Sequence, residues 1–297
     1  MSERKLSMLE EISAKIKNST DSPYLDAQTL LAHITGLEKS YLMAHPEIEL
    51  SPSQKKQVSE AVEKMNSNIP LPYVLGQWEF YGLNLFINQD VLIPRPETEL
   101  LVEKALNWLE DNPDRRRVLD VGTGSGCIAI AIADHIEDVR LIAGDISRKA
   151  LKVARKNAKK FDVVDRVKFF CCDLFPPLDK GGWRRFFDQG GSNSFGADLI
   201  LANLPYIPSS TLKELDVYGR EPSIALDGGA DGLDLIRKFI SLAPAYLAPG
   251  GRILMEIEEN QGLAALSLAY DQFSEARIHL HQDLSGRDRF LDIHSLG

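Results

Sequence analysis

The feature that most constrains this chain is a short apolar segment that ends in alternating glycines. Residues 117–121 are typical of a buried strand, and residues 127–135 are typical of a helix. Glycine permits a tight strand-to-helix turn and lets the backbone approach a ligand closely. The free N–H groups at the start of the helix would then face a polar ligand group. The turn between the two segments contains, in order, Gly122, Thr123, Gly124, Ser125 and Gly126.

An acidic residue at the end of the next strand gives this turn a more specific meaning. Residues 140–144 form a second apolar run, and Asp145 closes it, 23 residues after Gly122. A carboxylate in that place can accept hydrogen bonds from both hydroxyls of a ribose. The dinucleotide fingerprint needs G-x-G-x-x-G, and its third glycine would fall at Cys127. The pattern therefore predicts an adenosine site and weighs against NAD or FAD; a plain tight turn is the structural alternative.

Strands and helices alternate from residue 117 onward. Together they predict an α/β fold with a doubly wound, seven-stranded, mainly parallel sheet and helices on both faces. The last two strands would close it as an antiparallel hairpin. Residues 176–197 lack periodicity and are predicted to form a long surface loop. The expected strands are residues 117–121, 140–144, 168–171, 198–202, 252–257, 276–281 and 289–294.

The beginning of the chain follows a different pattern. Apolar residues recur at helical spacing through residues 1–74, and Ser51 and Pro52 provide an N-cap and a first helical position. Residues 75–95 then contain an aromatic, partly alternating stretch that is typical of a β-hairpin. We interpret residues 1–74 as a small helical domain, 75–95 as a linker with a hairpin, and 96–297 as the α/β domain.

Charge and cysteine content narrow the class of protein. The 43 acidic residues outnumber the 34 basic ones and give a net charge of −9, which weighs against a nucleic-acid substrate. Cys127, Cys171 and Cys172 form no CxxC pair, so we expect no metal site and a reducing, cytoplasmic environment. No apolar run has the length of a membrane helix, and we expect no membrane partner.

A second motif follows the strand at residues 198–202. Its residue types suit a substrate that carries a planar nitrogen, such as a side-chain amide. An amide nitrogen is a poor nucleophile because its lone pair is delocalised. Hydrogen-bond acceptors that hold both of its N–H groups would direct the lone pair toward an incoming methyl group. The side-chain oxygen of Asn203 and the backbone carbonyl of Leu204 are candidate acceptors. Pro205 restricts Leu204 to extended geometry, and Tyr206 can stack on a planar substrate. Asn203, Pro205 and Tyr206 are thus candidate catalytic residues acting through orientation; an ordinary Asn-Pro turn is the alternative.

Several segments resemble known families. Residues 118–133 resemble motif I of the class I methyltransferases, and residues 203–206 resemble the Asn-Pro-Pro-Tyr motif of amino methyltransferases, which act on adenine, guanine or glutamine. Residues 92–99, 221–233 and 283–289 are similar to signatures of the peptide chain release factor glutamine N5-methyltransferases. The resemblance covers nearly the whole chain. One departure is Leu204, which stands where proline is usual.

The resemblance implies a cofactor and a substrate. The cofactor is S-adenosylmethionine, and the substrate is the glutamine of a Gly-Gly-Gln loop in a release factor, which the helical domain would help to dock. The matching positions imply that the glycine turn holds the methionine end of the cofactor and that Asp145 binds its ribose. Residues 203–206 would bind the glutamine. Leu174 would pack on the adenine. Asp173 ends the third strand and either approaches the adenine or caps a turn.

Two further residues and three alternatives remain open. Glu97 and Thr98 would lie near the methionyl group of the cofactor, or they would cap a helix expected at residues 100–109. The alternative substrates are a ribosomal-protein glutamine and the amino group of a nucleic-acid base. A binding module without activity is the third alternative, and the chain is expected to be a monomer.

Overall fold

The computed structural model describes residues 7–178, 186, 187 and 196–296. The chain divides into two compact units, Met1–Trp78 and Glu79–Gly297. The loop predicted for residues 176–197 falls mostly outside the described residues. Within the described ranges, no helix has the length and apolar character needed to cross a bilayer.

The first unit is a bundle of helices around its own apolar core. Ser51 is the N-cap of α4, as predicted: its hydroxyl accepts from the Gln54 N–H at 3.3 Å, and the Gln54 side chain accepts from the Ser51 N–H at 2.9 Å. This reciprocal pair satisfies two free donors at the helix start. The described helices are α1 (Met8–Ile16), α2 (Pro23–Thr35), α3 (Lys39–Ala44), α4 (Pro52–Asn66) and α5 (Leu71–Leu75).

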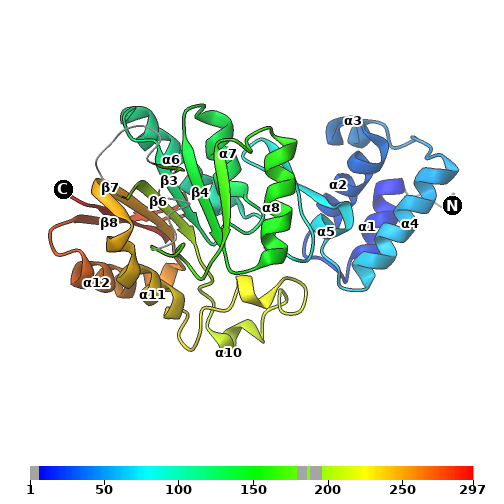
Figure 1. Cartoon of the computed structure of the whole chain (residues 1–297). Helices are drawn as coiled ribbons and strands as arrows, with labels where there is room; N and C mark the ends of the chain where they lie inside the picture. Colours follow the sequence, from blue (N-terminus) through cyan, green and yellow to red (C-terminus); the bar gives the residue numbers. More distant parts are fainter. Residues whose placement is uncertain (1–6, 179–185, 188–195, 297) are drawn as a thin grey trace. The chain divides into compact units, whose positions relative to one another are not determined.

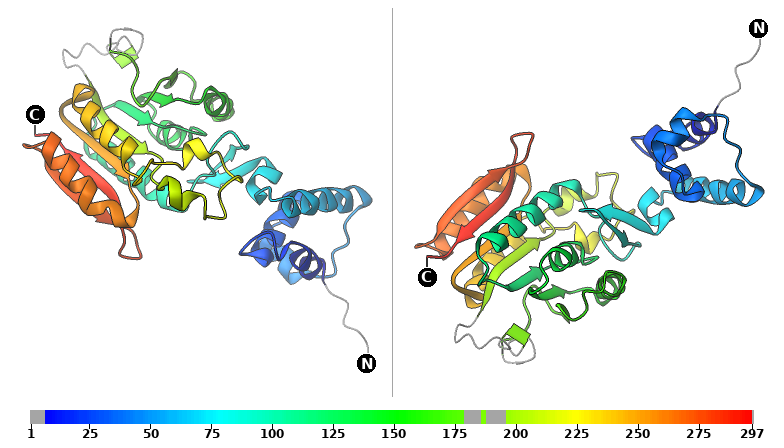
Figure 2. Two further views of the ribbon diagram at one scale, coloured as in Figure 1. Left: turned by 90° about the horizontal axis from the view of Figure 1, so that it is seen from below. Right: turned by 90° about the horizontal axis from the view of Figure 1, so that it is seen from above.

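The second unit contains the predicted sheet. In the described part of the chain, seven strands form one sheet in the order β5-β4-β3-β6-β7-β9-β8, parallel except for β9, which is antiparallel to both neighbours (Figure 1). The closing hairpin lies at one edge (Figure 2), and the predicted fold class is confirmed. The strands are β3 (Arg117–Val121), β4 (Arg140–Asp145), β5 (Val167–Cys171), β6 (Ala197–Asn203), β7 (Leu247–Glu256), β8 (Arg277–Gln282) and β9 (Asp288–His294); β1 (Gln77–Phe80) and β2 (Leu83–Phe86) pair separately.

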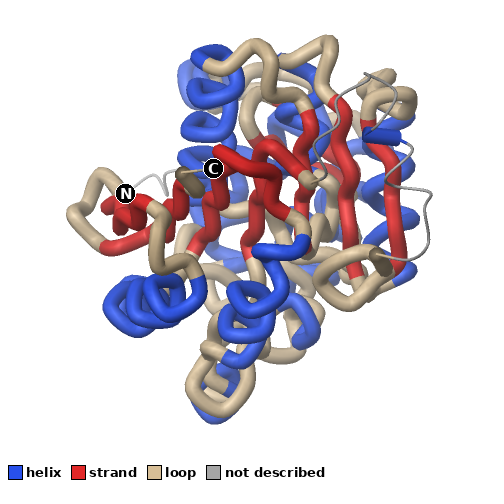
Figure 3. Tube along the Cα trace, turned by 60° about the vertical axis from the view of Figure 1, so that its left-hand side comes forward, coloured by secondary structure: helices blue, strands red, loops and turns tan. Residues whose placement is uncertain are grey.

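Helices cover both faces of this sheet (Figure 3). Alternation along the strands divides the core: Val118 packs with α6 and α7 on one face, and Leu119 packs with α11 on the other. The helices described in this unit are α6 (Pro96–Asp111), α7 (Cys127–His135), α8 (Arg148–Lys160), α10 (Ser209–Leu212), α11 (Asp234–Leu242) and α12 (Gly262–Gln272), with short 3₁₀ turns η1 (Ser223–Ala225), η2 (Ala243–Ala245) and η3 (Glu259–Gln261).

The order of the strands determines where a ligand can bind. The chain runs outward from β3 through β4 to β5 and then returns to β6 on the other side of β3. The strand order therefore reverses between β3 and β6. The connections that leave these two strands run in opposite directions, and a crevice opens at the carboxyl ends of the strands. Gly122 follows β3 and Asn203 ends β6, so both sequence motifs lie at this point.

Candidate active site

Backbone hydrogen bonds hold the glycine turn. Gly122, Gly124 and Gly126 have φ angles of 78°, 55° and 84°, a region that glycine adopts without strain. The N–H groups of Gly122 and of the next residue both donate to the carbonyl of Gly144 at 2.9 Å. A Cβ at Gly126 would lie 3.1 Å from the Cβ of Ala154. The turn therefore requires glycine for both its conformation and its packing.

Asp145 is fixed by the turn beside it. Its Oδ2 accepts from the Gly124 N–H at 2.8 Å, and its Oδ1 accepts from the Ser147 N–H at 2.7 Å. Burial raises the pKa of Asp145. Each carboxylate oxygen retains acceptor capacity beyond the one bond that it makes. Both carboxylate oxygens can therefore accept further hydrogen bonds from ligand hydroxyl groups.

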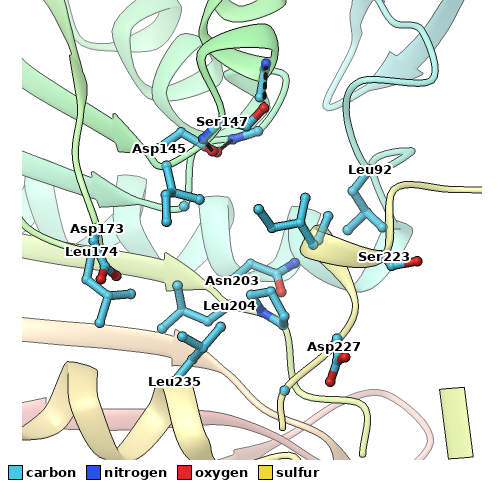
Figure 4. A pocket seen from close by; sticks show the side chains of 18 of the residues that line it. Leu92, Asp145, Ser147, Asp173, Leu174, Asn203, Leu204, Ser223, Asp227 and Leu235 are labelled. Atoms are coloured by element: carbon cyan, nitrogen blue, oxygen red, sulfur yellow. Dashed lines mark hydrogen bonds between the residues drawn. The ribbon is translucent and has the colours of Figure 1, made fainter. Parts of the chain in front are cut away.

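A cavity of about 560 Å³ lies at the carboxyl ends of the central strands. Asp173 and Leu174 lie on one side, Leu92 and Ser223 on the other, with Asn203 between them (Figure 4). The sequence-predicted site residues that line it are Gly122, Gly124, Asp145, Asp173, Leu174, Asn203, Leu204 and Pro205; those outside its lining are Glu97, Thr98, Thr123, Ser125, Gly126 and Tyr206.

The two polar residues of the turn are buried away from this lining. Thr123 Oγ1 donates to Asp120 Oδ2 at 2.5 Å, and burial raises the pKa of Asp120 to about 7. Among the residues that the structure describes, the Ser125 hydroxyl and Asp120 Oδ1 have no hydrogen-bond partner. Asp120 was not among the predicted site residues, although a carboxylate inside an apolar strand is a readable signal.

The two residues after β5 contribute differently to the cavity. The Asp173 carboxylate pairs with Lys238 of α11 at 2.5 Å. Leu174 is 8% exposed and has a φ of 62°, a left-handed conformation that is uncommon for a branched side chain. The apolar Leu174 side chain thus forms part of the wall where the resemblance implies an adenine ring.

The Asn203 side chain belongs to a network with Thr98 and Glu256. Its Nδ2 donates to Thr98 Oγ1 at 2.9 Å and to Glu256 Oε2 at 3.0 Å, and Thr98 Oγ1 donates to the same Oε2 at 2.7 Å. Thr98 and Glu256 are 2% and 1% exposed. Sequence reasoning missed Glu256, which ends β7 directly opposite Asn203 in the strand register.

The start of α6 differs from the prediction. The helix begins at Pro96 with Arg95 as its N-cap, so the start expected at residue 100 is wrong. Proline is favoured at the first helical position because its φ suits the helix and its missing N–H is not needed there. Thr98 is therefore inside the helix and faces the core, whereas Glu97 is exposed. The capping role considered for these two residues is also wrong.

The backbone of Tyr206 packs closely against the glycine-rich residues 228–232. Its hydroxyl is 3.5 Å from Glu256 Oε1, and burial raises its pKa. A Cβ at Gly228 would lie 2.7 Å from Tyr206 Cα, and one at Gly232 would lie 2.2 Å from its carbonyl oxygen. These glycines let residues 228–232 approach the backbone of the asparagine motif closely.

The fold and site together define a class I methyltransferase. Residues 118–181 match the family described as methyltransferase domain. The fold is similar to the crystal structure of the hMettl16 catalytic domain, with a TM-score of 0.54 and 15% identity over 83% of each chain.

Relatives of known name specify the family. The chain is 36% identical to the release factor glutamine methyltransferase of Moorella thermoacetica, over 91% of this chain and 90% of the relative. It is 35% identical to that of Coxiella burnetii, over 94% and 95%. Residues 7–76 match the family described as PrmC N-terminal domain. The chain belongs to the release factor glutamine methyltransferases, an enzyme family whose methyl donor is S-adenosylmethionine.

Proposed function

We propose that this chain methylates the side-chain amide nitrogen (N5) of the glutamine in the Gly-Gly-Gln loop of a peptide chain release factor. The observation that carries the proposal is the orientation of the Asn203 side-chain amide. Both hydrogens of its Nδ2 are engaged by Thr98 and Glu256, which leaves Oδ1 to accept a substrate N–H in the cavity that Asn203 lines. The names of the relatives supply the class of substrate.

The cavity has the groups that S-adenosylmethionine requires. Asp145 offers two carboxylate oxygens to the ribose hydroxyls, Gly122 and Gly124 leave room for the methionine end, and Leu174 offers an apolar surface to the adenine. Thr123, Ser125, Gly126 and Asp173 support this part of the site. The bound cofactor supplies a methyl group on a sulfonium sulfur.

Asn203 at the end of β6 and the residues that follow it hold the substrate glutamine. Asn203 Oδ1 takes one N–H of the glutamine amide, and the backbone carbonyl of Leu204 takes the other. With both N–H groups held, the nitrogen lone pair is directed at the methyl group. Pro205 and Tyr206 fix the path of the chain around these acceptors. Catalysis then rests on preorganised dipoles rather than on proton removal before the transfer.

The helical unit contributes docking in this proposal. Residues 1–74 would bind the body of the release factor, and the chain would act as a monomer in the cytoplasm. The net charge of −9 does not favour a direct nucleic-acid partner. A protein substrate agrees better with this acidic balance than tRNA or ribosomal RNA does.

Transfer of labelled methyl groups tests the proposal. The purified chain is incubated with methyl-labelled S-adenosylmethionine and one of four acceptors: a release factor, the same factor with alanine in place of the loop glutamine, ribosomal proteins, or total RNA. We expect label only in the unchanged factor. Equal labelling of the alanine factor would exclude the loop glutamine, and label in RNA alone would favour a nucleic-acid substrate.

A further inference from the structure

Three elements meet behind the Asn203 side chain. Thr98 comes from the first turn of α6, Asn203 from the end of β6, and Glu256 from the end of the neighbouring strand β7. The Thr98 and Glu256 side chains are almost completely buried, whereas Asn203 also reaches the cavity. Side chains that are packed in this way have little freedom to rearrange.

The direction of each hydrogen bond follows from Glu256. An ionised carboxylate can only accept, so the single hydroxyl hydrogen of Thr98 goes to Glu256 Oε2. Thr98 Oγ1 then has only lone pairs to offer to Asn203. Both groups that face the Asn203 amide are therefore acceptors, and they require its NH₂ side.

We propose that Glu256 is a positioning residue, which acts with Thr98 to hold the Asn203 amide in the one orientation that points Oδ1 at the substrate. This inference rests on the proposed function. If the amide turned over, Asn203 would present N–H groups to the N–H groups of the substrate glutamine. Two donors facing each other in a buried site leave both unsatisfied, which is costly.

Replacement of Glu256 by glutamine removes this constraint without changing the size of the side chain. A glutamine can offer either its oxygen or its NH₂ group to Thr98 and Asn203. Both orientations of the Asn203 amide then form complete hydrogen bonds. Only one of them accepts from the substrate, so the active fraction of the enzyme falls.

The surroundings of Glu256 give the proposal a dependence on pH. Burial is the main cause that raises the pKa of Glu256, and Glu97 of α6 adds to it, whereas Thr98, Arg289 of β9 and Tyr206 lower it; the net pKa is about 7. The thiol of Cys127 in α7 also interacts electrostatically with this carboxylate; it stays neutral, because burial raises its pKa to about 12. Protonation at Oε2 would turn an acceptor into a donor. We therefore expect kcat to rise with pH through about 7.

The test compares Glu256→Gln with the wild type in steady-state methylation of the release factor. We expect kcat to fall about tenfold to a hundredfold, as for the loss of a partner that orients a functional side chain from behind. The KM for the factor and the calorimetric Kd for S-adenosylmethionine should change by less than about threefold. The rise of kcat near pH 7 should disappear. Unchanged kcat with an unchanged pH profile would overturn the proposal, as would a parallel loss of cofactor affinity and kcat.

Matched variants separate orientation from folding. Thr98→Ser keeps the hydroxyl and should retain most of the wild-type kcat, whereas the equally sized Thr98→Val should lower it. Equal kcat in the two variants would contradict the network. Hydrogen exchange of the Asn203 side-chain NH₂, followed by NMR and assigned with Asn203→Ala, needs no methyl transfer: it should be slow in the wild type and faster in Glu256→Gln. Failure of the wild type to methylate the factor would instead reject the proposed function and leave this exchange result to decide the inference.

Discussion

The glycine turn and the asparagine site lie at the same edge of the sheet, but different kinds of contact hold them in place. The turn is contiguous with β3, and its conformation is held mainly by backbone hydrogen bonds to the Gly144 carbonyl, with one further bond from the Gly124 N–H to the Asp145 carboxylate. Asn203 is fixed by side chains that lie 105 and 53 residues away along the chain. Backbone geometry survives most substitutions, whereas a side-chain network does not survive the loss of one member. We therefore expect mutations in the two regions to affect different measurements.

Removal of the Asn203 side chain should have the largest effect. In Asn203→Ala one of the two acceptors that we propose for the substrate is lost, and we expect kcat to fall about a hundredfold to a thousandfold. The Kd for S-adenosylmethionine, measured by calorimetry, should stay within about threefold of the wild type, because the turn does not depend on this side chain. Near-normal transfer would remove Asn203 from the mechanism. A large loss of cofactor affinity would end the distinction between the two regions.

Substitution of Leu204 tests whether this residue acts through its backbone carbonyl or through its side chain. Its side chain is 3% exposed, and its Cδ2 would lie 3.1 Å from a Cβ at Gly122. Leu204→Ala should lower the free energy of unfolding by about 2–4 kcal/mol, measured in urea, because a buried leucine leaves a cavity. The carbonyl acceptor remains, so kcat below the melting temperature should fall by less than about tenfold. A larger loss of kcat with full stability would show that the side chain itself contacts substrate.

Substitution of Asp145 tests the glycine turn, where we expect a change in cofactor affinity rather than in kcat. In Asp145→Ala two backbone N–H groups lose their acceptor, and the ribose loses the partner that we propose for it. We expect the Kd for S-adenosylmethionine to rise about tenfold to a hundredfold, as for the loss of charge-assisted hydrogen bonds. At saturating cofactor, kcat should change little. Unchanged affinity in calorimetry would exclude Asp145 from the cofactor site.

The smallest effect concerns stability and pH. The pKa of Glu256 is raised by burial from an ordinary value of 4.5 to about 7. Ionisation of a buried carboxyl costs free energy, so the wild type loses stability as pH rises through this window. Glu256→Gln carries no charge and should melt about 3 °C or more above the wild type near pH 8, with the difference closing toward about pH 5. A constant difference at all pH values would indicate packing rather than charge.

The same contrast explains what the sequence could predict. The sequence could place the glycines, Asp145 and Asn203 at one edge of the sheet because each lies in or directly after a strand that is visible in the pattern, and parallel strands bring their carboxyl ends together. The partners of Asn203 were not found as a network, because no local pattern relates Thr98 to Glu256. The start of α6 was misplaced because the apolar residues of that helix begin four positions after Pro96. The helix α11 escaped prediction although Ile236, Phe239 and Ile240 have helical spacing.

Tandem mass spectrometry of the release factor tests the central claim most directly. The factor is incubated with S-adenosylmethionine and either the wild-type chain or Asn203→Ala, after calorimetry has shown that both bind the cofactor. We predict one added methyl group on the side-chain nitrogen of the Gly-Gly-Gln glutamine with the wild type and none with the variant. A methyl group on another residue, or an equal gain with both proteins, would contradict the account.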